Sequence, residues 1–147
     1  MIIQKLEKKH LNEAYLLLNE LYDNTIIKQV FTEKYVHCLK DSDFYGIVAI
    51  QGEKVVGILI SRIINRLVKN KDILFIDDLI VHKDFRNKGI GRKLLEEAIR
   101  FGKNRNFETI ELTSYMPNIN SHRLYENMDF KKQHYKFKYY LDKKTTK

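Results

Sequence analysis

The residues with the clearest potential for chemistry lie between positions 76 and 95. An apolar segment that carries two adjacent carboxylates, Asp77 and Asp78, leads into a basic segment and then into a helical pattern that opens with two glycines, Gly89 and Gly91. Glycines there let backbone N–H groups approach a ligand closely, and the first turn of a helix offers unpaired N–H donors at the positive end of its dipole. This combination predicts a phosphate or diphosphate site. The basic side chains beside it are Arg86, Lys88, Arg92 and Lys93.

The spacing of the glycines excludes two well-known phosphate loops. The Gly-x-x-x-x-Gly-Lys-Ser/Thr pattern is absent, and the Rossmann fingerprint needs a third glycine and a downstream acid. Residues 86–91, Arg-Asn-Lys-Gly-Ile-Gly, instead resemble the Arg/Gln-x-x-Gly-x-Gly/Ala loop that binds the coenzyme A diphosphate in the GNAT N-acetyltransferase family. The Asp-Leu-Ile-Val-His before this loop and the Arg-Lys-Leu-Leu after it also match. The alternative is a structural loop that only caps an ordinary helix.

A second segment, residues 118–130, is similar to the family's Asn-x-x-Ala-x-x-x-Tyr-Glu-x-x-Gly-Phe motif. The chain departs from that motif at two positions, where Ser121 replaces alanine and Asp129 replaces glycine. Aspartate tolerates a left-handed turn better than most residues, so the turn is still expected. Within the family, residues 111–114, 122–125 and 133–137 look most like the aminoalkylphosphonate N-acetyltransferases. The matching motif residues are Asn118, Tyr125, Glu126 and Phe130.

The resemblance implies that the protein uses acetyl-CoA as a cosubstrate. The family pattern assigns the pantetheine amides to the backbone of one strand and the diphosphate to the loop that follows it, while Asn118 holds the coenzyme arm or the helix start. The coenzyme-binding residues expected on this basis are Leu79, Ile80, Val81, Arg86, Asn87, Lys88, Gly89, Ile90, Gly91, Arg92, Asn118 and Tyr125.

The implied reaction moves an acetyl group from acetyl-CoA to a primary amine. An amine resembling that of lysine has a pKa near ~10.4, so it arrives protonated and needs a base. Asp77 and Asp78 are the candidates. Because neighbours on a strand face opposite sides, one should point toward the substrate, and we favour Asp77. The backbone N–H of Leu79 or Ile80 is the expected oxyanion donor.

Tyr125 occupies the family's general-acid position and is expected to protonate the leaving thiolate. Two structural alternatives remain open. Either aspartate could cap a loop or pair with a lysine, and Tyr125 could be a core aromatic, since the chain has nine tyrosines.

The chain has 147 residues and a formal net charge of +8. Residues 131–147 carry seven lysines and one aspartate, and so account for six of the eight charges. Aromatic residues alternate with lysines over 135–139, which fits a nucleic-acid surface but fits better an edge strand with aromatics inside and lysines outside. The basic balance suits an anionic small acceptor, such as an aminoalkylphosphonate; Arg62 and Arg66 are speculative contacts for it or solvated side chains.

Hydrophobic periodicity predicts a mixed α/β (α+β) sheet covered by helices, in a single domain over 1–147 with a frayed tail at 142–147. The family resemblance implies a GNAT acyl-CoA N-acyltransferase fold, with a mostly antiparallel sheet and a splayed parallel pair. The pattern predicts strands at 2–6, 45–50, 55–64, 73–81, 109–113 and 132–140, and helices at 11–22, 33–39, 89–104 and 121–127.

Features that the sequence lacks exclude several kinds of site and several classes of protein. The single cysteine, Cys38, excludes an internal disulfide and a cysteine-based zinc cluster. No segment resembles a signal peptide or a membrane span, so we expect a cytoplasmic protein. The histidines lack a metal-ligand spacing, although the phosphonate enzymes are associated with a divalent metal, which stays unassigned. A homodimer is common in the family. A protein N-terminus or lysine as acceptor, and a non-catalytic acyl-CoA-binding module, remain as alternatives.

Overall fold

A computed structural model of the chain describes residues 1–142 and 144. The strands are β1 (Ile2–Lys5), β2 (Phe44–Gln51), β3 (Lys54–Ile64), β4 (Ile73–Val81) and β5 (Thr109–Leu112). The helices are α1 (Leu11–Leu21), α2 (Lys28–Lys40), α3 (Ile90–Asn104) and α4 (Ile119–Asn127), with the 3₁₀ turns η1 (Lys8–His10) and η2 (Lys83–Phe85). The chain divides into two compact units, Met1–Leu112 (unit 1) and Thr113–Lys147 (unit 2). The prediction of a single domain stays a prediction.

Unit 1 is built on a five-stranded sheet in the order β1-β2-β3-β4-β5. Neighbouring strands pair antiparallel except β4 and β5, which pair parallel. The turn between β2 and β3 contains Gly52, whose φ of 64° fits the predicted hairpin. The predicted mixed sheet with one parallel pair is confirmed.

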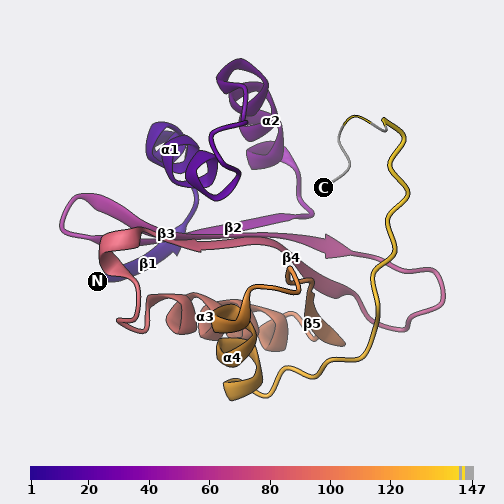
Figure 1. Cartoon of the computed structure of the whole chain (residues 1–147). Helices are drawn as coiled ribbons and strands as arrows, with labels where there is room; N and C mark the ends of the chain where they lie inside the picture. Colours follow the sequence, from indigo (N-terminus) through magenta and orange to yellow (C-terminus); the bar gives the residue numbers. More distant parts are fainter. Residues whose placement is uncertain (143, 145–147) are drawn as a thin grey trace. The chain divides into compact units, whose positions relative to one another are not determined.

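Helices cover both faces of this sheet. In Figure 1, α1 and α2 lie on one face and α3 lies on the other. The first face holds an apolar core in which Leu18 of α1 and Tyr35 of α2 pack with Ile58 of β3 and Ile80 of β4. On the opposite face α3 buries one apolar stripe, including Leu94 and its neighbours on the same side of the helix, as expected for an amphipathic helix on a sheet.

The helix predicted at 33–39 is longer than expected and begins at Lys28. Its first turn begins with the two polar residues Lys28 and Gln29, and the sequence pattern predicts a helix only from Glu33 onward. Phe31 nevertheless packs against Tyr15 and Tyr35, with ring centroids 5.4 and 5.6 Å away. This aromatic packing between α1 and α2 stabilises the extra turn.

The strand predicted at 132–140 is wrong. Over the part of the chain that the structure describes, residues 131–140 form no strand and make no ladder hydrogen bonds. The side chains expected to lie inside are outside: Tyr135 and Phe137 are each 92% exposed. Alternation reflects strand propensity, whereas a strand also requires a paired neighbour. The tail predicted at 142–147 lies largely outside the described residues.

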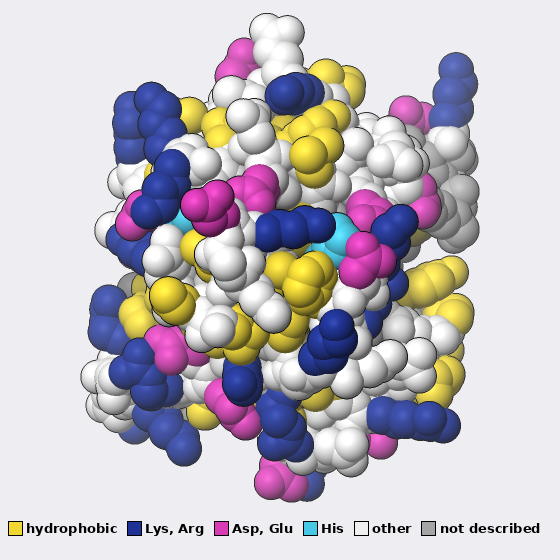
Figure 2. Space-filling model, turned by 90° about the vertical axis from the view of Figure 1, so that its left-hand side faces the viewer, with side chains coloured by type: hydrophobic (Ala, Val, Ile, Leu, Met, Phe, Trp, Pro, Cys, Tyr) yellow, Lys and Arg dark blue, Asp and Glu magenta, His cyan; other side chains and the backbone are white. Residues whose placement is uncertain are grey.

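Figure 2 shows Lys and Arg side chains spread over one face, with Asp and Glu among them. Some of these charges pair locally, as Lys9 does with Glu7 at 3.0 Å. This mixed distribution is typical of a solvated surface.

None of the described helices combines the length and the apolar character that crossing a membrane would require. The predicted cytoplasmic location and the homodimer stay predictions.

Candidate active site

The loop between β4 and α3 has the backbone conformation that suits a diphosphate. Asn87 (φ 60°) and Gly89 (φ 78°) are both left-handed, and such residues let successive amides point into one concavity. A Cβ built on Gly89 would meet no atom within 4 Å. Glycine is therefore favoured at this position by the positive φ and not by lack of space.

The amides of residues 87–92 are available for a ligand. The helix α3 begins at Ile90, and the first amide bonded back to the helix start is that of Lys93, which donates to the Gly89 carbonyl at 3.1 Å. Among the described residues, the preceding amides have no protein acceptor. They lie at the positive end of the helix dipole, so the loop can bind an anion.

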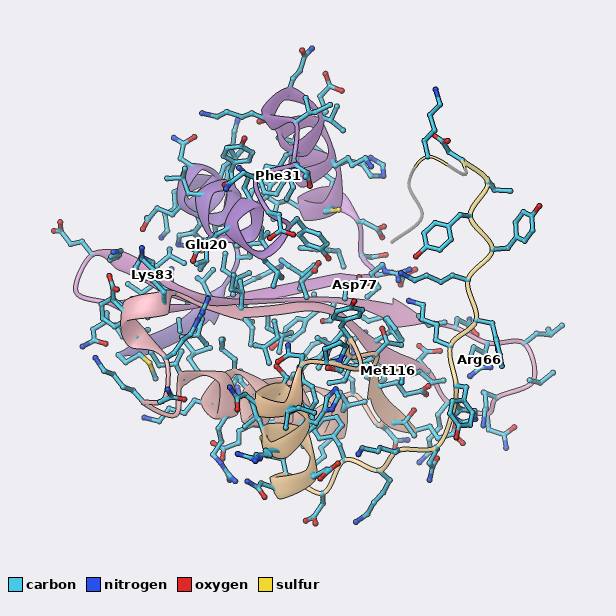
Figure 3. All side chains as sticks on the ribbon, in the orientation of Figure 1. Glu20, Phe31, Arg66, Asp77, Lys83 and Met116 are labelled. Atoms are coloured by element: carbon cyan, nitrogen blue, oxygen red, sulfur yellow. The ribbon has the colours of Figure 1, made fainter. Side chains whose placement is uncertain are left out.

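Basic side chains accompany the loop, and Arg86 also supports it structurally. The Arg86 guanidinium donates through Nε to the carbonyl of Val81 at 2.9 Å, and its Nη2 lies 3.9 Å from Glu20. Figure 3 shows Glu20 and Lys83 at this end of unit 1. The exposed basic residues in or beside the loop are Lys83, Arg86, Lys88, Arg92 and Lys93.

The start of α3 is fixed to the sheet by close packing. A Cβ on Gly57 of β3 would lie 3.0 Å from side-chain atoms of both Ile90 and Leu94, so the sheet accepts the helix only where a side chain is missing. The Ile90 side chain is 4% exposed. A ligand can therefore reach the backbone amide of Ile90, a predicted coenzyme-binding residue, but not its side chain.

Among the described residues, no strand pairs with the edge of β4 that leads into the loop. β5 pairs with β4 only as far as Ile76 and Leu112, whereas β4 continues to Val81. On its other side β4 stays paired with β3, through Leu79, Ile80 and Val81. The backbone groups that point away from β3 over this stretch can therefore bind an extended ligand as another strand would.

A β-bulge decides where the two aspartates lie. Ile60 of β3 is paired with Asp78, but the next residue, Ser61, is paired with Ile76, so Asp77 is the extra residue. A bulge interrupts the alternation of side chains between the two faces. The expectation that Asp77 and Asp78 point to opposite faces is wrong for this reason: both carboxylates interact with groups on the face that α1 and α2 cover.

The two carboxylates have different partners. Both oxygens of Asp77 accept hydrogen bonds from the Arg62 guanidinium, at 2.7 and 2.8 Å. One oxygen of Asp78 accepts a hydrogen bond from the Tyr22 hydroxyl. The other oxygen of Asp78 accepts no hydrogen bond from the described residues. Figure 3 shows Asp77 on the sheet and Phe31 among the helices that cover it. Asp78 is thus the carboxylate with an oxygen left for a ligand.

Burial raises the pKa of the Asp78 carboxyl above its ordinary value, and the nearby charge of Asp77 raises it further, while the hydrogen bond from Tyr22 acts in the opposite direction. Burial and the bond to Asp78 also raise the pKa of the Tyr22 phenol. The phenol therefore stays protonated and remains a donor. A carboxylate with a raised pKa in a cavity wall is a candidate proton acceptor.

Asp78 lines a cavity of about 390 Å³ between α2, the α1–α2 connection and the sheet. Most of its lining is apolar or aromatic, with Phe31, Phe44 and Ile60 among the residues. The polar exceptions, apart from the tyrosine Tyr35, are Thr25, Lys34 and Asp78. We call this space the acceptor cavity.

Unit 2 contains the other predicted site residues. Asn118 caps α4, its side chain accepting a hydrogen bond from the Ser121 amide at 3.4 Å. The helix ends in the left-handed residue Asp129 (φ 64°), and the Phe130 amide donates to the Tyr125 carbonyl at 3.0 Å. This is a Schellman ending. The expectation that aspartate adopts the left-handed turn is confirmed.

Tyr125 is half-buried within unit 2. Its ring centroid lies 5.9 Å from that of Phe130. Burial raises the pKa of its phenol, so the hydroxyl is protonated at neutral pH. It is in the correct form to give up a proton.

Two contacts at the site were missed by sequence reasoning. Tyr22 lies at the end of α1, 56 residues before Asp78, and nothing in its local sequence signals the contact. Arg62 was considered only as a contact for an anionic acceptor or a solvated side chain, but it pairs with Asp77. Arg62 is paired with Phe75, two residues before Asp77, so the contact is a diagonal one across the antiparallel pair.

The described residues contain no group of three or more His, Cys, Asp or Glu arranged to hold a metal ion. The divalent metal stays unassigned.

Residues 9–130 match the model of the acetyltransferase (GNAT) family. The chain is 26% identical to an aminoalkylphosphonate N-acetyltransferase of Salmonella typhimurium (strain LT2), over 86% of this chain and 82% of that protein. The fold is similar to that of a transcriptional regulator from Bacillus halodurans C-125, with a TM-score of 0.84, 23% identity and coverage of 95% of this chain and 99% of the other.

It is also similar to the aminoglycoside N-acetyltransferase AAC(6')-Iy, solved in complex with CoA, with a TM-score of 0.84, 16% identity and coverage of 95% and 93% of the two chains. At these identities the two structures show the fold. The family model covers most of the chain, and the acetyl-CoA-dependent N-acetyltransferase class follows from it together with the curated relative. The chain belongs to the acetyltransferase (GNAT) family.

Proposed function

We propose that the protein transfers an acetyl group from acetyl-CoA to the primary amine of a small molecule. The observation that carries this proposal is the organisation of β4. One strand bears the half-free carboxylate of Asp78 in the wall of a cavity and ends in the amide-rich loop that begins α3. Acetyl transfer from acetyl-CoA requires a base near the amine and a site that holds the diphosphate of the coenzyme, and β4 provides a candidate for each.

In this proposal, backbone groups of the loop and of β4 bind the coenzyme. The free amides of 87–92 bind the diphosphate, with the exposed basic side chains adding charge. The backbone of Leu79–Val81 pairs with the pantetheine amides along the open edge of β4. Asn118 and Tyr125 are proposed as coenzyme-binding residues on the family resemblance alone.

Asp78 is our proposed base. The ammonium of the acceptor gives a proton to the free oxygen of Asp78, directly or through water, and the released nitrogen lone pair attacks the thioester carbonyl carbon. The contacts favour Asp78 over Asp77, because Arg62 occupies both oxygens of Asp77. The earlier preference for Asp77 stays untested.

The tetrahedral intermediate then collapses. The N–H of Leu79 or Ile80 donates to the oxyanion, the carbon–sulfur bond breaks, and the thiolate of CoA takes a proton from Tyr125. The nitrogen still carries a second proton after the attack; this proton returns to the Tyr125 phenolate through water, and Asp78 releases its own proton to solvent. The products are the N-acetylated amine and free CoA.

The acceptor is proposed to be small because the cavity is small. An aminoalkylphosphonate is one candidate, by similarity to the Salmonella relative.

The test is an acetyl-transfer assay that follows release of free CoA. The panel should contain aminoalkylphosphonates, polyamines, aminosugars, arylalkylamines and a lysine peptide. We expect amine-dependent release with at least one small amine and confirmation of its N-acetyl product by mass spectrometry. Binding of CoA without transfer to any amine would contradict the enzymatic proposal and favour a binding module. Acetylation of the peptide alone would contradict the small-molecule acceptor.

A further inference from the structure

The acceptor cavity indicates which kind of amine the protein takes. Its volume of about 390 Å³ is near the lower end of the range for small-molecule sites. A compact ligand is therefore required, and the character of the walls can distinguish between compact ligands.

The walls offer few hydrogen bonds. The hydroxyl of Tyr35, which lines the cavity, is already used, because it donates to the carbonyl of Glu7 at 2.6 Å. Thr25 is likewise engaged through its hydroxyl, which donates to the Tyr22 carbonyl at 2.6 Å. A ligand with many hydroxyl groups would leave them without partners, at a cost of about 1–3 kcal/mol each.

The charges of the cavity favour a cation over an anion. Asp78 supplies a carboxylate with a free oxygen, and the cationic lining residue is the exposed Lys34. Arg62 could bind an anion in principle, but its guanidinium is held by both oxygens of Asp77. Phosphonates are bound by several donors or by a paired guanidinium, and a phosphonate here would approach the carboxylate of Asp78.

We propose that the acceptor is a primary amine joined by a short linker to a compact apolar body, either aromatic or branched alkyl. Its ammonium lies at the free oxygen of Asp78, and its body fills the space beside Phe31 and Phe44. This inference rests on the proposed function, because it names the substrate class of the same site.

The test compares 2-phenylethylamine with 2-aminoethylphosphonate, which share a two-carbon linker and differ in the body. We expect kcat/KM to be about a hundredfold higher for 2-phenylethylamine, the scale at which an apolar pocket discriminates. An equal or reversed ratio would overturn the inference. So would acetylation of only the polyamines or aminosugars of the panel, although the proposed function would then stand.

A second measurement reads binding without turnover. Cys38 is the only cysteine of the chain and lines the cavity, so its alkylation by iodoacetamide, followed by mass spectrometry, reports occupancy. We expect 2-phenylethylamine to slow alkylation several-fold and 2-aminoethylphosphonate to leave it unchanged. If no amine in the panel is acetylated, the proposed function fails, and this protection still decides the inference. Equal protection by both compounds, or by neither, contradicts it.

A charge variant tests the electrostatic part. Val30 lines the cavity and is 43% exposed, so Val30→Lys adds an ammonium without burying it. The kcat/KM ratio of the two amines should shift about tenfold toward 2-aminoethylphosphonate. The matched control is Leu16→Lys, because Leu16 is a helical residue that is 67% exposed and is not part of the lining. An equal shift in both variants would contradict a role of the cavity.

Discussion

The loop between β4 and α3 and the acceptor cavity differ in how far each depends on local sequence. The loop, residues 86–92, uses backbone amides from one short segment, and its shape depends on two left-handed residues. The cavity uses side chains from residues 6 to 78, which reach it from several elements. The loop can therefore be recognised from a short motif, whereas the cavity depends on how distant parts of this chain pack together.

The largest expected effect comes from the cavity. Asp78→Asn keeps the size of the side chain but removes the proton acceptor, so kcat should fall by about 10²- to 10⁴-fold. The KM for acetyl-CoA should hardly change, since the loop is untouched. Steady-state kinetics with both substrates varied provides the measurement. Asp77→Asn is the comparison variant, and a greater loss of kcat there would assign the base to Asp77.

Tyr125 belongs neither to the loop nor to the cavity lining, so a variant at this position tests the acid step without altering either region. We expect Tyr125→Phe to lower kcat by about 10²-fold, because the thiolate would leave without a proton donor. Affinity for acetyl-CoA should be nearly unaffected. Unchanged turnover would remove Tyr125 from the acid role and leave it as a packing residue against Phe130.

A smaller effect is expected in the loop and should fall on the coenzyme alone. Gly89→Val places a β-branched residue at a φ of 78°, so the loop must shift. Loss of one charge-assisted hydrogen bond corresponds to about a tenfold or greater rise in the KM for acetyl-CoA.

Gly52→Val is the matched control for this variant. Gly52 has a φ of 64° and equally open surroundings, but it lies in the β2–β3 turn. The backbone strain should be similar, so a comparable loss of stability is expected in both variants. A rise in KM in the Gly52 variant as well would mean that general destabilisation accounts for the effect.

The smallest effect concerns pH. The hydrogen bond from Tyr22 lowers the pKa of Asp78 and opposes the effect of burial. Its loss in Tyr22→Phe raises that pKa, and because the base acts when deprotonated, the acid limb of kcat/KM against pH should move to higher pH. Above this limb the rate should change only a few-fold. Tyr45→Phe, on the opposite face of the sheet against Phe101, should leave the profile in place. A shift to lower pH in Tyr22→Phe would contradict the assignment.

What could be predicted from the sequence was local. The glycine at position 89, the helix that follows it and the left-handed Asp129 depend on the φ preferences of a few neighbouring residues. Apolar periodicity predicted the positions of the five observed strands, and the family resemblance predicted a mostly antiparallel sheet with one parallel pair.

What could not be predicted depends on distant segments. The bulge at Asp77 arises from the register between β3 and β4, and the hydrogen bond from Tyr22 to Asp78 arises from how α1 ends over the sheet. The strand expected at 132–140 failed because propensity does not supply a hydrogen-bonded partner. Local rules therefore predicted the loop and the start of the helix, while the orientation of the two carboxylates required the fold.

Calorimetric titration with CoA and with pantetheine, which lacks the diphosphate, tests the account most directly. We expect CoA to bind wild-type protein at least tenfold more tightly than pantetheine, and Gly89→Val to remove most of that difference while Gly52→Val keeps it. Absence of heat with CoA, or equal affinity for CoA and pantetheine in the wild type, would contradict a diphosphate site at residues 87–92.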